Sequence, residues 1–286
     1  MTRIAALATL VVCACSAPGR PFSGGGADAP VASPGGADAA AAPVAPASGA
    51  HPAYLAAPEG PSGVVLGLIT LARPAPRVAV APVPGPSACP GSIAAPVLEL
   101  APSGGVIGAV VWLDDIARGK PLPGADAPAA ELAFDGCVLR PRAVLVPGPG
   151  GKLAVRNEDP VRHVATLRFR GVAWLDSQGE GERTLAEWPM PLVGQRFEIA
   201  LDRPGIVEVE GEPAPAAHAL AIVPRHPYFA ITDADGRYRL SGVPPGRYQV
   251  RAWHPPIDGA HELWALGNAE VVANGAAEVN LPLQTP

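Results

Sequence analysis

Residues 226–254 constrain the fold more than any other stretch, because strand and turn signals alternate there without interruption. Tyr238 and Leu240 alternate with arginines, which is the two-residue period of half-buried β-strands. Two turn sequences separate the apolar runs, Asp233-Ala-Asp-Gly236 and Val243-Pro-Pro-Gly246. The pattern predicts a pair of β-hairpins in an all-β chain.

The same residues resemble a known family. Thr232–Leu240 followed by Val243–Tyr248 is similar to the signature of carboxypeptidase regulatory-like domains, which are transthyretin-like β-sandwiches that bind or present other molecules without catalysing a reaction. The resemblance implies such a unit over residues 226–286. It lacks the family's opening strands at this end of the chain, so an earlier segment has to complete the sheet.

Two strand pairings are expected around this unit. Gly63–Leu71 is a β-branched run, and we expect it to lie beside the C-terminal strands as the missing opening. Residues 269–283 carry strand signals on both sides of Asn274-Gly275, a dipeptide that favours a tight turn, so we expect a closing hairpin there.

Composition divides the chain into ordered and unordered parts. The 286 residues include 33 Gly and 37 Pro, near the share that signals disorder. Residues 16–61 are mostly Ala, Gly, Pro and Ser without apolar periodicity, so we expect a disordered tether there. The net charge of -5 and the absence of a basic cluster argue against a nucleic-acid partner.

The first residues carry an export signal. A short cationic start is followed by the apolar run Ile4–Val12, which is too short to span a bilayer. Val12-Cys-Ala-Cys15 resembles a bacterial lipobox, which implies a lipoprotein signal peptide over residues 1–15 and a lipid on Cys15. The residue after Cys15 is Ser16, and by resemblance to Gram-negative lipoproteins this implies sorting to the outer membrane instead of retention at the inner membrane. The alternative is an ordinary cleaved signal without a lipid. Either way we expect an exported protein, in the periplasm or at the cell surface, and the membrane as a partner through the anchor.

Two cysteines, Cys89 and Cys137, remain after export. In an oxidising compartment they are most simply explained as one disulfide. The rival interpretation is a free, metal-binding thiolate.

A second resemblance covers residues 62–225. Several motifs follow one another in the order seen in cupredoxin-like proteins of the methylamine-utilisation or plastocyanin-like kind: Cys137–Arg142, Asn157–Pro160 with His163, Pro204-Gly205 and His226–Phe229. The resemblance implies a Greek-key β-sandwich. In that family a type 1 copper is held by a histidine at the position of His163, and by a Cys, a His and a Met in a later loop.

The chain departs from this pattern in the later loop. The expected Cys falls at about Gly211, the second His at about Ala214 and the Met at about Ala217. Without sulfur in that loop, the strong copper–thiolate bond of a type 1 site cannot form. We therefore expect no cofactor, with copper as the alternative.

His163 has two interpretations. The alternation over residues 161–169 places it on the core-facing side of a strand, where a buried histidine normally hydrogen-bonds to backbone. Alternatively His163 and His218, with Glu210 or Glu212, form a weak site for Cu(II) or Zn(II), since imidazole suits both metals.

The chain has no G-x-S-x-G, no phosphate-cradling glycine loop and no H-E-x-x-H, so we expect no catalytic residues and no enzyme activity. The function expected is that of a non-catalytic envelope lipoprotein with a degenerate cupredoxin site, acting as a binding or structural module for an envelope protein or glycan. One alternative is a periplasmic copper-binding or electron-transfer protein that uses His163 and His218. The other is a carbohydrate-binding module with an aromatic edge made of Trp253, Trp264, Tyr228 and Tyr248.

Overall fold

A computed structural model describes residues 53–73, 83–84, 89, 92–93, 98–114, 116–175, 181–214, 217–256 and 261–284. Its regular elements are all β-strands, so the expected all-β class is confirmed. The described residues belong to one compact unit, residues 41–286. None of them forms a helix long and apolar enough to cross a membrane. The expected signal peptide, with Cys15, lies outside the described residues.

Sandwich 1, residues 130–223, consists of two sheets around one apolar core. One sheet has the order β10 (Val138–Arg140), β9 (Ala130–Asp135), β12 (Gly151–Asn157), β15 (Arg196–Leu201). The other has the order β11 (Ala143–Leu145), β17 (His218–Val223), β16 (Gly205–Glu212), β13 (His163–Arg170), β14 (Glu182–Met190). Along β13 buried and half-buried residues alternate strictly, as a strand with one face on a core requires.

Sandwich 2 is made of strands from both ends of the described chain. One sheet has the order β18 (Phe229–Ile231), β7 (Val110–Asp114), β20 (Gly246–His254), β21 (Leu263–Val271). The other has the order β19 (Arg237–Val243), β2 (Gly63–Leu71), β22 (Ala276–Glu278), and β23 (Leu281–Leu283) also pairs with β2. A second apolar core lies between these sheets.

Three short pairs of strands lie outside the sandwiches: β1 (Leu55–Ala56) with β8 (Arg118–Gly119), β3 (Val83–Pro84) with β4 (Ser92–Ile93), and β5 (Glu99–Leu100) with β6 (Val106–Ile107). The first pair corrects one expectation. The sequence predicts a disordered tether that includes residues 53–61. In the structure Tyr54 packs against the core of sandwich 2, and its hydroxyl donates a hydrogen bond to the carbonyl of Lys120 at 2.6 Å. Tertiary contacts of one aromatic residue thus order the end of the Ala- and Pro-rich segment.

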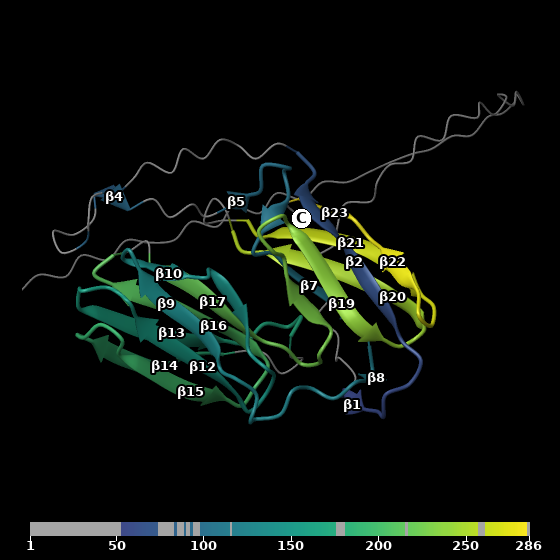
Figure 1. Ribbon diagram of the computed structural model, residues 1–286, viewed down its shortest axis with the longest axis horizontal. Coiled ribbons are helices and arrows are strands. Elements are labelled where there is room, and N and C mark those ends of the chain that lie inside the picture. Colours follow the sequence, from purple (N-terminus) through teal and green to yellow (C-terminus); the bar gives the residue numbers. More distant parts are fainter. Residues whose placement is uncertain are drawn as a thin grey trace, which may run out of the picture. The chain divides into compact units, whose positions relative to one another are not determined.

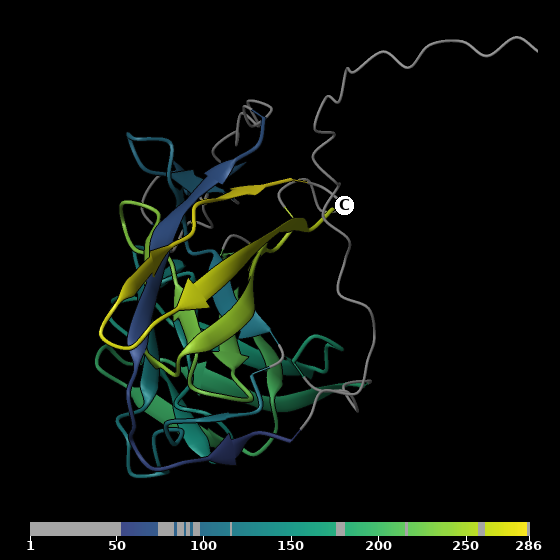
Figure 2. The ribbon, with the colours of Figure 1, turned by 90° about the vertical axis from the view of Figure 1, so that its right-hand side faces the viewer.

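The expected place of Gly63–Leu71 is confirmed. This segment, β2, pairs with β19 on one side and with β22 and β23 on the other. Figures 1 and 2 show the blue β2 among the yellow and green C-terminal strands. The close approach depends on Gly67, because a Cβ there would collide with the carbonyl oxygen of Val279.

The expected hairpins are wrong, although their strands and turns are present. β18, β19 and β20 follow one another in sequence, but β19 pairs with β2 while β18 and β20 pair with β7. Likewise the chain turns at Asn274, whose φ is 58°, yet β22 pairs with β2 and not with β21. Each turn carries the chain from one sheet of the sandwich to the other. A turn sequence fixes a change of direction, and the facing sheet can then offer more apolar burial than the neighbouring strand.

Sandwich 2 also divides the chain differently from the expected ranges. β2 and β7 both fall within residues 62–225, the range expected for the cupredoxin-like unit, but their partners are C-terminal strands. Sandwich 1 therefore begins at β9, and the chain of sandwich 2 is interrupted by it.

A third apolar cluster joins the two sandwiches. Its aromatic members centre on Trp112, whose ring stacks on Trp174 at 4.6 Å between centroids and on Phe229 at 5.7 Å. Ile206 and Leu220 of sandwich 1 pack into the same cluster. Offset aromatic stacking adds to the burial of apolar area, so this cluster fixes one sandwich against the other.

A disulfide joins Cys89 to Cys137, the pairing expected from the sequence. Both residues are buried in the core of sandwich 1, and they are 48 residues apart in the chain. The bond therefore ties the segment before β9 to the turn between β9 and β10.

We predict that replacing both cysteines, Cys89→Ala with Cys137→Ala, lowers the free energy of unfolding by about 4 kcal/mol, because the cross-link restricts a long loop in the unfolded chain. Urea denaturation of the oxidised protein and of the double variant checks this. A loss below about 1 kcal/mol would contradict the assigned role of the bond.

Asp114 is a buried carboxylate at the end of β7. It accepts a hydrogen bond from Nε of Arg251 at 2.5 Å, and its other oxygen lies 3.2 Å from Nη2 of Arg225, which is in the connection that leaves sandwich 1. The three side chains are between 8% and 14% exposed. Ionised groups that are buried to this degree stabilise the fold only while each keeps a partner of opposite charge.

We predict that Asp114→Asn lowers the free energy of unfolding by about 3 to 5 kcal/mol, because it removes the buried negative charge that pairs with Arg251 and Arg225. The matched control is Glu270→Gln, which breaks an exposed ion pair with Arg247 and should cost less than about 1 kcal/mol. Urea denaturation measures both variants. Equal losses in the two would count against the buried network.

Candidate functional site

His163 is the first residue of β13, and its ring is fully buried in sandwich 1. The ring points to the core because successive side chains of β13 face opposite sides of the sheet, and every second residue from His163 to Phe169 is buried. The ring of Phe134 lies parallel to the imidazole, with 4.1 Å between centroids and 2° between planes. The histidine is thus part of the core packing, as the main interpretation of the sequence expects.

Both ring nitrogens of His163 are engaged. Nδ1 lies 2.9 Å from the carbonyl oxygen of Glu212, and Nε2 lies 2.9 Å from Oδ2 of Asp159. Each nitrogen is therefore within hydrogen-bond distance of an oxygen atom of the protein. A metal ion could reach this ring only by displacing one of these contacts.

Asp159 is itself held by backbone. Its carboxylate accepts hydrogen bonds from the N–H groups of Gly136 and Cys137, both at 2.8 Å. Asn157 shapes the turn, since its Oδ1 accepts the N–H of Asp159 and its amide donates to the carbonyls of Val161 and Met190. The Asn-Glu-Asp-Pro motif therefore builds a hydrogen-bonded support for His163.

Three described residues of the later loop, Gly211, Ala214 and Ala217, pack closely against the core. A Cβ at Gly211 would collide with the ring of Phe134 and would lie 2.7 Å from the Cβ of Ala217. Ala214 and Ala217 are buried in the core of sandwich 1. The loop is closed by hydrogen bonds from the N–H of Gly211 to Ala217 and from the N–H of Ala217 to Ala214. Small side chains and backbone thus fill the positions where copper ligands were expected.

One cluster of potential ligand atoms does occur in the described residues. Sγ of Cys137, a carboxylate oxygen of Asp159 and a ring nitrogen of His163 lie within 4.8 Å of one another. The sulfur is bound in the disulfide, and the other two groups are bonded to each other. These residues do not fit a type 1 copper site, which needs a thiolate and two free imidazole nitrogens.

The structure does not bring His163 and His218 together. His218, on β17, is directly opposite Glu210 on β16, which in turn is opposite Thr166 on β13. Residues opposite one another share a face of the sheet, and Thr166 is an odd number of residues from His163, so the two histidines lie on opposite faces. The pair is therefore corrected as a metal site: His163 faces the core, and Glu210 instead pairs with Arg168 at 2.7 Å.

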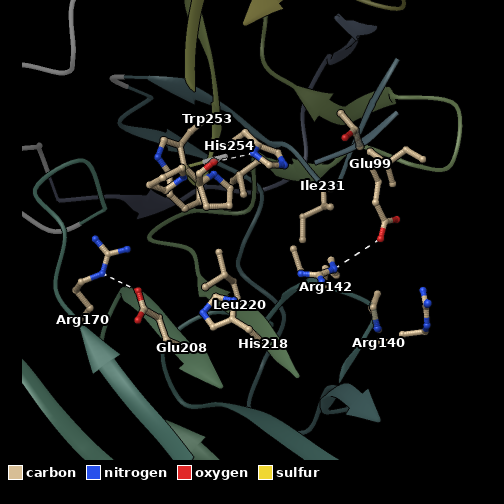
Figure 3. A pocket seen from close by; sticks show the side chains of 18 residues that line it. Glu99, Arg140, Arg142, Arg170, Glu208, His218, Leu220, Ile231, Trp253 and His254 are labelled. Atoms are coloured by element: carbon tan, nitrogen blue, oxygen red, sulfur yellow. Dashed lines mark hydrogen bonds and ion pairs between the residues drawn. The ribbon is translucent and has the colours of Figure 1, made fainter. Parts of the chain in front are cut away.

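His218 lines a pocket of about 610 Å³ between the two sandwiches, which we call the inter-sandwich pocket. Figure 3 shows His218 and Leu220 across the pocket from Trp253 and His254. Its lining residues come from both sandwiches and from β5: Glu99, Ile107, Gly108, Val110, Arg140, Pro141, Arg142, Ala143, Arg170, Glu208, His218, Leu220, Ile231, Thr232, Trp253, His254, Pro255 and Pro256.

Three arginines and two glutamates charge the pocket. Nε of Arg170 donates to Glu208 at 3.0 Å, across β13 and β16. Nε of Arg142 lies 3.6 Å from Glu99, which is a longer and weaker contact. Burial lowers the pKa of Arg142, and the neighbouring charge of Arg140 lowers it further, while Glu99 opposes both.

The two imidazoles of the pocket are neutral at neutral pH. Burial lowers the pKa of His218, with Glu208 acting in the opposite direction. Burial likewise lowers the pKa of His254, against a hydrogen bond between its Nδ1 and the carbonyl of Pro255 at 2.8 Å. The pocket thus offers hydrogen-bonding rings that add no charge.

The aromatic edge expected for carbohydrate binding is not at the surface. Trp253, Trp264 and Tyr228 are at most 4% exposed, and Tyr248 packs against the core of sandwich 2. Their rings serve the cores and the junction of the sandwiches, so they offer no exposed platform for a sugar.

The sequence reasoning missed the pocket. Its most specific signal is Arg140-Pro-Arg142, where two arginines flank a proline just after a strand. The rest of the lining, including Val110, His218 and Trp253, comes from other segments of the chain, so periodicity within one segment could not place it.

No family model matches the chain, and no curated protein matches it. Part of the chain resembles several solved structures. A copper-containing nitrite reductase from Thermus scotoductus SA-01 is 16% identical over 36% of this chain, with a TM-score of 0.25, and the match spans 25% of the reductase.

Two smaller proteins are matched over most of their own length. A purple cupredoxin from Nitrosopumilus maritimus is 18% identical over 32% of this chain and 97% of its own, with a TM-score of 0.24. Amicyanin from Paracoccus versutus is 20% identical over 36% of this chain and 90% of its own, also with a TM-score of 0.24. Similarity at this level transfers neither a ligand nor an activity to this chain.

Proposed function

We propose that this protein is a non-catalytic binding or structural module of the bacterial envelope, in which a cupredoxin-type metal position has become part of the core. The observation that supports it is that both ring nitrogens of the fully buried His163 lie 2.9 Å from oxygen atoms of the protein, the carbonyl of Glu212 and the carboxylate of Asp159. A metal ion would have to displace one of these contacts inside the core.

Two further features support the proposal. The loop that carries the remaining ligands in cupredoxins has Gly211, Ala214 and Ala217 at those places. The sulfur of Cys137 is committed to the disulfide. The alternative, copper binding or electron transfer through His163 and His218, requires both rings on one face of the sheet.

We also propose that the protein is exported and held to the outer membrane by a lipid on Cys15. The support is the sequence Val12-Cys-Ala-Cys15 after a short apolar run, followed by Ser16. A module anchored in this way acts on partners within reach of its tether.

We predict that Cys15→Ser moves the protein from the membrane fraction to the soluble fraction of the envelope, because it removes the acylated sulfur. Cys13→Ser is the matched control and should leave the protein with the membranes. Fractionation with immunoblotting measures both. Membrane association of the Cys15→Ser protein would show that the anchor is not this lipid.

We predict that the metal-stripped protein, titrated with Cu(II), develops no intense visible charge-transfer band, because no thiolate is available as a ligand. His163→Ala should leave weak copper uptake unchanged, yet lower the free energy of unfolding by about 1 to 3 kcal/mol, since Asp159 loses a hydrogen-bond donor. Absorption spectroscopy, calorimetry and urea denaturation measure these effects. An intense blue band that His163→Ala abolishes would overturn the proposed function.

A further inference from the structure

We propose that the inter-sandwich pocket binds a small organic carboxylate, a monoanion whose carboxylate group meets Arg142 and Arg140. The apolar body of the ligand lies against Ile107, Ile231 and Pro255. This inference rests on the proposed function only in treating the protein as a binder that works without a metal.

The charge of the lining selects the charge of the ligand. Among the described lining residues three arginines face two glutamates, and both imidazoles are neutral, so these residues carry one excess positive charge. A monoanion balances this excess. A phosphate monoester carries close to two negative charges at neutral pH and exceeds it.

The excess charge lies at one end of the pocket. Arg170 and Glu208 are paired with each other at 3.0 Å across neighbouring strands, so their charges cancel locally. At the other end, the single negative charge of Glu99 offsets only one of the two positive charges of Arg140 and Arg142. The two guanidinium groups and Glu99 lie at the same side of the pocket in Figure 3.

Arg142 is the better placed of the two arginines to hold a carboxylate. Its contact with Glu99 uses Nε at 3.6 Å, and its two Nη groups, which carry most of the N–H donors of a guanidinium, take no part in that contact. Its side chain is only 26% exposed. A partly buried guanidinium beside a second cation gains from a bound carboxylate, which it can meet with two parallel hydrogen bonds.

The rest of the pocket suits an apolar body. Ile107, Ile231, Pro255 and Pro256 line the pocket and are half-buried, so each keeps apolar surface that a ligand can cover. The volume of about 610 Å³ is in the range of small-molecule sites.

Isothermal titration calorimetry with naphthoate tests the inference on the full protein in the presence of a chelator. Two probes of the same shape are the comparisons: neutral naphthamide and the dianion naphthyl phosphate. We expect naphthoate to bind at least about tenfold more tightly than either, because only naphthoate matches the excess charge. Equal binding of the amide, tighter binding of the phosphate, or no binding of naphthoate would overturn the inference.

Variants locate the binding site. Arg142→Gln should weaken naphthoate binding about tenfold or more, since it removes a charge-assisted pair. Arg140→Gln changes an exposed side chain, so it leaves folding intact and should weaken binding about threefold. The matched control is Arg239→Gln on β19, also exposed and outside the pocket, which should change nothing.

Unaltered affinity in both pocket variants would overturn the inference even if naphthoate binds. Because copper is chelated throughout, failure of this experiment is separate from failure of the proposed function. The proposed function is lost only if a blue copper band appears.

Discussion

The structure of sandwich 1 depends on the hydrogen bonds that connect the buried carboxylate of Asp159 to three other residues. Asp159 is 8% exposed, and its carboxylate receives the N–H groups of Gly136 and Cys137 together with Nε2 of His163. One side chain thereby connects the turn between β9 and β10 to the start of β13. Through the other nitrogen of His163, the same chain of hydrogen bonds reaches Glu212 at the end of β16. Loss of the carboxylate would leave several buried donors without an acceptor, which costs more than each bond contributes when formed.

The same carboxylate supports the turn that carries the disulfide. Cys137 has φ of 62°, a conformation that residues with a side chain rarely adopt, and the hydrogen bond from its N–H to Asp159 holds it there. The Asn-Glu-Asp-Pro motif at residues 157–160 thus supports a cross-link and a buried ring. A metal would compete with protein acceptors for both nitrogens of His163, so stability of the core and metal binding are opposed in this chain.

The sequence was sufficient for features that depend on one segment or on one chemical rule. The strands in residues 226–254 follow from their period of two, β2 follows from a missing opening strand, and the disulfide follows from pairing Cys89 with Cys137. Pairing was harder, because Val243-Pro-Pro-Gly246 reverses the chain equally well within one sheet or between two.

For a similar reason, the sequence could not predict whether His163 and His218 lie on the same face of the sheet. Alternation fixes the face of each residue within its own strand, but the faces of β13 and β17 are related only through the register of β16 between them. The inter-sandwich pocket is harder still to predict, because its lining comes from several segments whose relative positions the sequence pattern does not fix. Arg142, His218 and Trp253 come from strands or turns far apart in the chain, and only the packing of the sandwiches places them around one space.

The interruption of sandwich 2 has a consequence for the order in which the molecule assembles. β2 and β7 are synthesised before the strands that cover their edges. Until those strands follow, β2 presents two open edges and an apolar face, which are the features that recruit foreign strands. The intervening sandwich has all its own partners and can close at once. The chain thus needs its last sixty or so residues to protect β2, and a protein cut short before them exposes an aggregation-prone segment that has lost its pairing strands.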